Sequence, residues 1–187
     1  MFGSHPTTSY TALQEKDEIR LLHLHPGTGT SPLKCTLHHV QLSDCPRYEA
    51  LSYQWGSESS PRTIEFNDQP RHVRSNLYFA LQHLRHRRKP RVLWVDALCI
   101  NQEDDKERGH QVFQMGTIYS HASQVCVWVG LADSFAEGVF RLLSRKETMG
   151  GIKRGAIKHP EDLYDMAQFC KREYWDRLWI IQEVVLA

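Results

Sequence analysis

VLWVDALCI, at residues 92–100, is an apolar run interrupted by a single carboxylate, Asp96. A continuous apolar run of this length is typical of a strand that is buried on both faces of a sheet. The polar residues Asn101 and Gln102 follow it directly. We therefore interpret residues 92–100 as a buried strand that delivers its C-terminal end to a polar loop.

Two similar apolar runs lie on either side of this stretch, at residues 48–56 and 124–130. Apolar residues at helical spacing predict helices over residues 76–86, 106–122 and 134–143, the first with Ser75 as its N-cap. Strand and helix therefore alternate after residue 47, which is typical of α/β domains. We predict an α/β fold with a mostly parallel central sheet flanked by helices.

The residues before position 48 add a hairpin to this pattern. Residues 19–24 and 33–42 have the pattern of strands, and a segment rich in Gly and Pro separates them. A smaller hairpin is predicted over residues 64–73, around Asn67 and Asp68. We expect residues 1–16 to be a flexible lead and residues 17–187 to form one domain.

The composition is that of an ordinary globular chain. Of its 187 residues, 41% are hydrophobic, which is enough for a sizeable core, and the net charge is only +1. A nucleic-acid partner is therefore not expected. The basic run at residues 85–91 is better explained as a solvated helix end, although phosphate contact is the alternative.

The cysteines and histidines do not form a recognisable metal or redox motif. The five cysteines include no CxxC pair, and the His38-His39 pair has no further ligand at metal-site spacing. There is also no signal peptide, membrane span, GxSxG, P-loop or GxGxxG motif. We expect a cytoplasmic protein without a membrane contact, a metal or a cofactor.

Residues 174–187, YWDRLWIIQEVVLA, predict a helix that is apolar almost all the way round and therefore buried. The carboxylate in its middle, Glu183, is costly to bury unless it is paired or opens into a cleft. Trp179 precedes it by four residues and shares its side of the helix. Glu183 is therefore a candidate functional residue, and an ion pair with Arg177 or another basic residue is the alternative.

Further candidates stand where the predicted strands end, because ligands of open α/β sheets bind beyond the C-terminal ends of the strands. At the first end, aromatic rings would stack on a base or a nicotinamide ring and a glycine would allow close backbone approach, with a turn and core packing as the alternative. At the second end, polar groups would hold ligand hydroxyls, with loop capping by Asp96 as the alternative. These candidates are Ser52, Tyr53, Trp55 and Gly56, followed by Asp96, Cys99, Asn101 and Gln102.

The same residues resemble the HET domain, the heterokaryon incompatibility domain of filamentous fungi, over about residues 19–187. The segments that carry the resemblance are residues 48–56, 93–102, 111–119 with Ala122, 128–130 and 175–183. The resemblance implies a fungal intracellular protein that triggers cell death in non-self recognition. It also implies an upstream sensor, because HET domains usually belong to larger proteins whose other parts recognise a partner.

HET domains are in turn remotely similar to TIR domains, which implies a TIR-like, flavodoxin-like fold with the N-terminal hairpin as an addition. TIR enzymes carry a catalytic glutamate in a Trp-Cys-x-x-Glu pattern on the helix after the third strand. Here Trp179 and Glu183 have that spacing, with Ile180 in place of the cysteine. The resemblance implies Glu183 as the catalytic carboxylate and residues 52–56 as pocket residues.

Two hypotheses for the activity follow. The first is an NAD nucleosidase, in which NAD or a related nucleotide is the substrate and Glu183 stabilises the charge that develops on the ribose. TIR enzymes often complete their site by close packing of two copies, so we expect a homo-oligomer when active. The second hypothesis is a non-enzymatic death-signalling module that acts by self-association or partner recruitment, through aromatic and basic surfaces that include residues 85–91.

Overall fold

The computed structural model of the chain describes residues 10–144, 160–177, 180 and 183. These residues fall into two compact units. The larger unit comprises residues 10–128 together with Ile180 and Glu183, and the smaller one comprises the described residues between 129 and 177.

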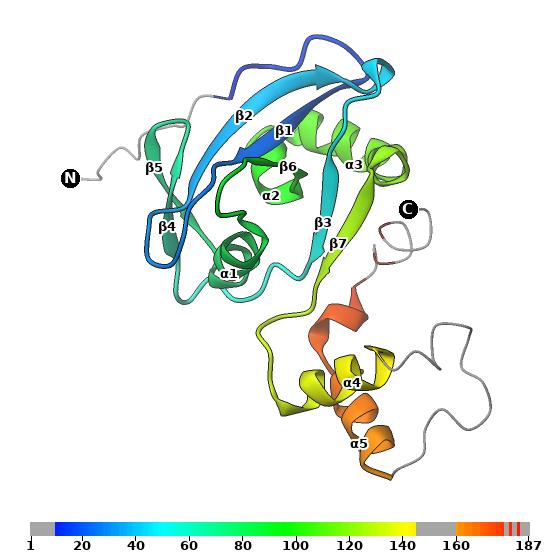
Figure 1. Cartoon of the computed structure of the whole chain (residues 1–187). Helices are drawn as coiled ribbons and strands as arrows, with labels where there is room; N and C mark the ends of the chain where they lie inside the picture. The colour runs from blue at the N-terminus through cyan, green and yellow to red at the C-terminus, as the bar shows by residue number, and fades with distance from the viewer. Residues whose placement is uncertain (1–9, 145–159, 178–179, 181–182, 184–187) are drawn as a thin grey trace. The chain divides into compact units, whose positions relative to one another are not determined.

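The larger unit is built on a seven-stranded sheet of order β5-β4-β2-β1-β6-β3-β7 (Figure 1). Strand β3 is parallel to both of its neighbours, β6 and β7, and β2 is parallel to β4. The pairs β1–β2, β1–β6 and β4–β5 are antiparallel. The strands are β1 (Glu18–Leu24), β2 (Lys34–Gln41), β3 (Glu49–Tyr53), β4 (Arg62–Phe66), β5 (Gln69–Val73), β6 (Arg91–Trp94) and β7 (Gln124–Trp128).

The α/β class is confirmed, but the prediction of a mostly parallel sheet was wrong, because the sheet is mixed. Both predicted hairpins exist, as β1–β2 and β4–β5. The first is more than an addition to the sheet, since β1 pairs with β6 and joins the hairpin to the parallel strands. In the second, Asn67 and Asp68 have φ angles of 49° and 61°, the left-handed geometry that tight hairpin turns require.

The predicted strand over residues 92–100 was too long. Strand β6 ends at Trp94, and a short helix, α2 (Asp96–Cys99), replaces the rest of the apolar run. The carbonyl of Val95 accepts hydrogen bonds from the N–H groups of Leu98 and Cys99, at 3.0 and 2.7 Å. A short buried helix and a buried strand are equally apolar, so hydrophobicity could not separate them.

Two helices cover the parallel strands, α1 (Ser75–Leu84) and α3 (Asp105–His121). Ser75 is not the N-cap of α1 as predicted, because its hydroxyl donates instead to the carbonyl of Ser60 and Arg74 occupies the cap position. Helix α3 is capped by Asp104, whose carboxylate accepts the N–H groups of Lys106 and Glu107.

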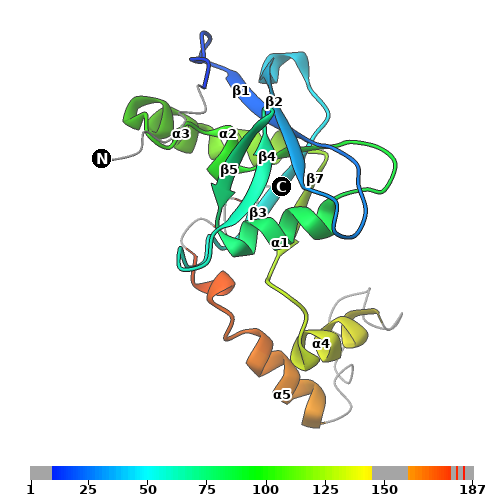
Figure 2. The same ribbon diagram turned by 90° about the vertical axis from the view of Figure 1, so that its left-hand side faces the viewer.

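Helices α1 and α3 lie on opposite faces of the sheet (Figures 1 and 2). The connections β3-α1-β6 and β6-α3-β7 run in opposite directions across the sheet, so right-handed crossovers place their helices on different faces. On the α3 face, Trp94 packs edge-on against Tyr119. On the α1 face, the indole N–H of Trp128 donates to Asn76 at 2.8 Å. These contacts identify the face to which each side chain of β3 points.

A buried ion pair ties the N-terminal hairpin to α3. Arg20 is 1% exposed, and its guanidinium donates to both carboxylate oxygens of Glu107, at 2.6 and 2.9 Å. The same guanidinium also donates to the carbonyls of Thr11 and Cys99. Glu107 accepts in addition the N–H of Asn101 at 2.6 Å. The pair therefore holds β1, α3 and the loop after α2 in one network.

The predicted flexible lead of residues 1–16 lies partly outside the described residues. Within residues 10–16, the hydroxyl of Tyr10 donates to the carbonyl of Leu98 at 3.1 Å, and its ring packs against Phe66 and under the Arg20 guanidinium. These contacts tie residues 10–11 to the core. Flexibility of the lead as a whole stays a prediction.

The smaller unit contains α4 (Ser134–Ser144), α5 (Pro160–Phe169) and the 3₁₀ turn η2 (Glu173–Asp176). Its core includes Ala136, Val139 and Phe169. The predicted helix over residues 174–187 does not begin at Tyr174, because residues 174–176 belong to η2 and Arg177 is not helical. Across the described ranges, no helix has the length and apolar character needed to cross a membrane.

The hairpin carries a histidine pair that predicts a dependence of stability on pH. The rings of His23 and His38 lie 4.0 Å apart, and burial, followed by the charges of His38 and His25, lowers the pKa of His23 below its usual 6.5. The folded state thus disfavours the protonated form, so this contribution to stability is present above pH 6.5 and is lost as the pH falls through the lowered pKa. We expect His23→Gln to reduce the loss of thermal stability between about pH 8 and about pH 5.5.

The matched control is His121→Gln, which removes an exposed histidine at the end of α3. Its melting temperature should follow the wild-type pH profile. An unchanged profile in the His23 variant would show that this histidine does not couple to folding.

Candidate functional site

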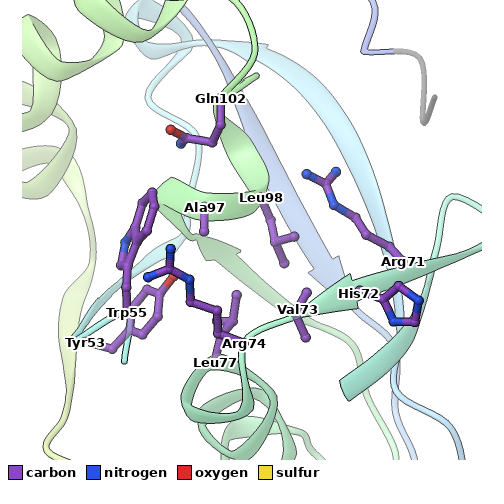
Figure 3. A pocket seen from close by; sticks show the side chains of 10 residues that line it. All are labelled: Tyr53, Trp55, Arg71, His72, Val73, Arg74, Leu77, Ala97, Leu98 and Gln102. Carbon is purple, nitrogen blue, oxygen red and sulfur yellow. The ribbon is translucent and has the colours of Figure 1, made fainter. Parts of the chain in front are cut away.

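A pocket lies beyond the C-terminal ends of β3 and β6, between α2, the start of α1 and the β4–β5 hairpin (Figure 3). Its volume is about 160 Å³. Apolar side chains form its floor, and polar and basic side chains form its rim. The lining residues are Tyr53, Trp55, Arg71, His72, Val73, Arg74, Leu77, Ala97, Leu98 and Gln102.

Three of the predicted site residues, Tyr53, Trp55 and Gln102, line this pocket. They come from separate segments of the sequence and are brought together because β3 and β6 are adjacent parallel strands that end at the same edge. Sequence reasoning missed the contribution of β5, which supplies Arg71, and of Arg74, which follows the strand. The available signal was a pair of arginines that follows a hairpin turn and leads directly into a helix.

Trp55 and Asp96 form the link between the two strand ends. The indole N–H of Trp55 donates to Asp96 Oδ2 at 2.8 Å, and Asp96 Oδ1 accepts the N–H of Ala97 at 2.7 Å. Asp96 is therefore a loop-capping carboxylate that also fixes an aromatic ring of the pocket. Its described contacts are those of the capping alternative, and Asp96 itself is not among the residues that line the pocket.

The guanidinium of Arg74 lies over the Trp55 ring, 5.0 Å from its centroid, and donates to the carbonyl of Gly56 at 3.0 Å. Gly56 has a φ angle of +72°, and a Cβ atom there would lie 3.3 Å from Asn76 Cβ. The glycine is thus required by the left-handed turn that ends β3. This turn presents its carbonyl to Arg74.

Asn101 and Gln102 shape the loop that follows α2. The side chain of Gln102 donates to the carbonyl of Asp96 at 2.9 Å and lines the pocket. The side-chain oxygen of Asn101 accepts the N–H of Glu103 at 3.2 Å, so this amide supports the turn and does not line the pocket.

Cys99 belongs to the core behind the pocket. It is 1% exposed, and burial raises the pKa of its thiol to about 12. The thiol sulfur accepts the N–H of Val95 at 3.3 Å. A thiol that stays protonated at neutral pH is a poor nucleophile, so the structure gives Cys99 a packing role.

Ser52 and Glu183 form a second polar contact on the other face of β3. The hydroxyl of Ser52 donates to Glu183 Oε2 at 2.5 Å, and both residues are fully buried. Ser52 is two residues after Ala50, which pairs with Trp94, so its side chain points to the α3 face. Tyr53 points to the α1 face with its partner Trp128.

The structure therefore divides the predicted site between the two faces of β3. Glu183 is buried, as predicted, and one of its contacts is the hydrogen bond from Ser52. Trp179 lies outside the described residues. No group of three or more potential ligands in the described part of the chain is placed to hold a metal ion.

The charge of the pocket is positive. Two arginines and a histidine line it, and none of the lining residues carries a carboxylate. Such a site favours an anionic ligand, with the Trp55 and Tyr53 rings and the apolar floor available to a less polar part of the same molecule. The larger unit therefore has a basic pocket at the ends of β3 and β6, and a buried carboxylate, Glu183, that contacts Ser52 of β3.

Residues 48–183 match the family model described as Heterokaryon incompatibility protein (HET), and the chain belongs to this family. The matched range includes both Ser52 and Glu183. A search of characterised proteins found Heterokaryon incompatibility protein 6, OR allele, from Neurospora crassa, 43% identical over 128 residues. The alignment covers 61% of this chain and 19% of that relative, so the chain spans about a fifth of its length. No solved structure matches the chain.

Proposed function

We propose that this chain triggers cell death in fungal non-self recognition, in the cytoplasm, by cleaving NAD with Glu183 as the catalytic carboxylate. Membership of the HET family and the name of the Neurospora relative support the role in heterokaryon incompatibility. The observation that carries the catalytic part is the hydrogen bond between Ser52 and Glu183. It joins the end of β3 to a helical carboxylate 131 positions later in the chain.

The order of the parallel strands also supports the proposal. Strands β6, β3 and β7 are parallel and stand in the spatial order second-first-third, with α1 and α3 on opposite faces. This is the order at the start of flavodoxin-like sheets, whose ligands bind where the strand order reverses. In this chain that point lies at the C-terminal end of β3, where Ser52 is located.

The reaction requires only one carboxylate. Cleavage of the bond between nicotinamide and ribose releases neutral nicotinamide from a cationic pyridinium, so the leaving group needs no general acid. Positive charge develops on the ribose, and Glu183 would stabilise it until water adds to the sugar and loses a proton. The products are nicotinamide, ADP-ribose and a proton. The hydroxyl of Ser52 would hold the carboxylate in one orientation.

Glu183 is 0% exposed, so a substrate can reach it only when the surrounding side chains move. We propose that self-association of two or more copies provides this rearrangement, and that an upstream sensor protein or domain controls it. Burial also strengthens the electrostatic effect of a carboxylate, because water no longer screens its charge.

A second candidate is a non-enzymatic death-signalling module. The observation that favours it is the same complete burial of Glu183, which also suits a carboxylate with a structural role in contact with β3. The smaller unit offers a surface for recruitment. Leu143 in α4 and Leu163 and Tyr164 in α5 are each more than half exposed.

Inducible expression in a filamentous fungus tests the proposal. Wild type should lower cellular NAD before the cells die, and Glu183→Gln should prevent both effects. A matched variant, Leu163→Asp, changes the exposed surface and leaves the Ser52–Glu183 contact intact. Death that survives Glu183→Gln but is lost in Leu163→Asp would contradict the enzymatic proposal and favour the recruitment module.

A further inference from the structure

The pocket at the ends of β3 and β6 is lined by Arg71, whose guanidinium is only partly hydrogen-bonded. Arg71 Nη1 is buried and has no hydrogen-bond partner among the described residues. Its guanidinium contacts two neighbouring aromatic rings, 4.6 Å from the centroid of Phe66 and 5.1 Å from that of Tyr10. A buried N–H on a charged group is costly to leave unpaired. The site therefore lacks an acceptor, and an anionic ligand would supply it.

Arg74 provides a second cation on the opposite side of the pocket. Figure 3 shows its side chain extending between Trp55 and Leu77, whereas the side chain of Arg71 extends from within β5. One nitrogen of Arg74 donates to Gly56, and another contacts Glu58, whose side chain is 77% exposed. An ion pair with so exposed a carboxylate contributes little. Arg74 can therefore exchange Glu58 for a ligand at small cost.

The remaining walls indicate what the anion is attached to. Tyr53 and Trp55 supply aromatic surface, and the floor is formed by Val73, Leu77 and Leu98. The paired N–H donors of an arginine guanidinium match the oxygens of phosphate, whereas aromatic and apolar walls suit a planar or sugar-like part of the same molecule. The volume of about 160 Å³ is below the roughly 300–1,000 Å³ of sites that enclose a whole drug-sized ligand. It therefore suits one phosphate end of a nucleotide.

We infer that this pocket binds the phosphate of a nucleotide, with Arg71 and Arg74 as its cationic ligands. The inference goes beyond the proposed function, because Tyr53 of the pocket points to the α1 face of β3 whereas Ser52, the partner of Glu183, points to the α3 face. It rests on the proposed function only for the identification of NAD as the nucleotide. Binding itself requires neither Glu183 nor cleavage. A nucleotide without a nicotinamide bond is thus a suitable probe.

Isothermal titration calorimetry of the whole chain with AMP, adenosine and inorganic phosphate tests the inference. AMP should bind to wild type, and adenosine should bind about tenfold more weakly or not at all, because it lacks the phosphate. Arg71→Gln should weaken AMP binding by about tenfold or more. The matched control is Arg62→Gln, on the neighbouring strand β4, where the arginine is exposed and does not line the pocket.

Because Arg71 also packs against Tyr10 and Phe66, His72→Glu serves as a second variant. His72 is exposed and lines the pocket, so the new carboxylate should repel AMP without disturbing the core.

Equal binding of AMP and adenosine, or wild-type affinity in both pocket variants, would overturn the inference. AMP binding that depends on Arg71 without any release of nicotinamide from NAD would refute only the proposed reaction. If the protein releases nicotinamide but its affinity for AMP is unchanged in the Arg71 and His72 variants, only this pocket assignment is refuted.

Discussion

Glu183→Gln is expected to lower the rate of nicotinamide release from NAD by about 10²–10⁴-fold, the largest effect that the proposed site predicts. The amide has the shape of the carboxylate but no charge, so it cannot stabilise the positive ribose. The Ser52 hydroxyl can still donate to the amide oxygen, as it now does to Glu183. We therefore expect the variant to fold normally, which circular dichroism and thermal unfolding would verify.

Glu103→Gln is the matched control for this experiment. It removes a carboxylate from the exposed loop after α2, where the side chain does not line the pocket. Its rate should stay within about twofold of wild type. A folded Glu183→Gln variant with the same rate as this control would remove Glu183 from the mechanism.

Arg20→Met is expected to lower the free energy of unfolding by about 3–5 kcal/mol, because it leaves the carboxylate of Glu107 buried without its cation. The side chains of Arg20 and Glu107 are 1% and 9% exposed. The carbonyls of Thr11 and Cys99 also lose their donors. Urea denaturation followed by tryptophan fluorescence would measure the change.

Two further variants separate the buried pair from a general loss of charge. Lys34→Met breaks the surface pair with Glu65, whose side chains are 54% and 33% exposed, and should cost no more than about 1 kcal/mol. The double variant Arg20→Met, Glu107→Met should recover part of the loss, since no unpaired charge remains buried. A cost for Arg20→Met as small as that for Lys34→Met would show that the pair does not hold β1 to α3.

The sequence predicted the elements of the larger unit better than their pairing. Apolar periodicity located both hairpins and the two helices that flank the parallel strands, because each signal is local. The antiparallel contact between β1 and β6 could not be predicted in this way, since it joins distant segments and leaves no periodic trace. The helix at residues 96–99 was missed for a different reason. Its residues are as apolar as the strand before them, and hydrogen bonds to Val95 determine its shape.

The candidate site was predicted in its residues more than in its geometry. Their positions at the predicted strand ends made Tyr53, Trp55 and Gln102 candidates, and these three residues line one pocket. The alternation of side chains along β3 separates Ser52 from Tyr53, and this division became visible only when the neighbours of each face were known. Arg71 was missed because hairpin arginines are usually solvated. Here its guanidinium contacts the ring of Tyr10, a residue near the N-terminus.

The most direct test of the central claim is the release of nicotinamide from NAD by purified wild-type protein at high concentration. The account predicts that nicotinamide and ADP-ribose appear in equal amounts, well beyond the amount of protein, and at a rate per molecule that rises with protein concentration as copies associate. Absence of release from protein that is folded, self-associated and lethal when expressed in fungal cells would contradict it.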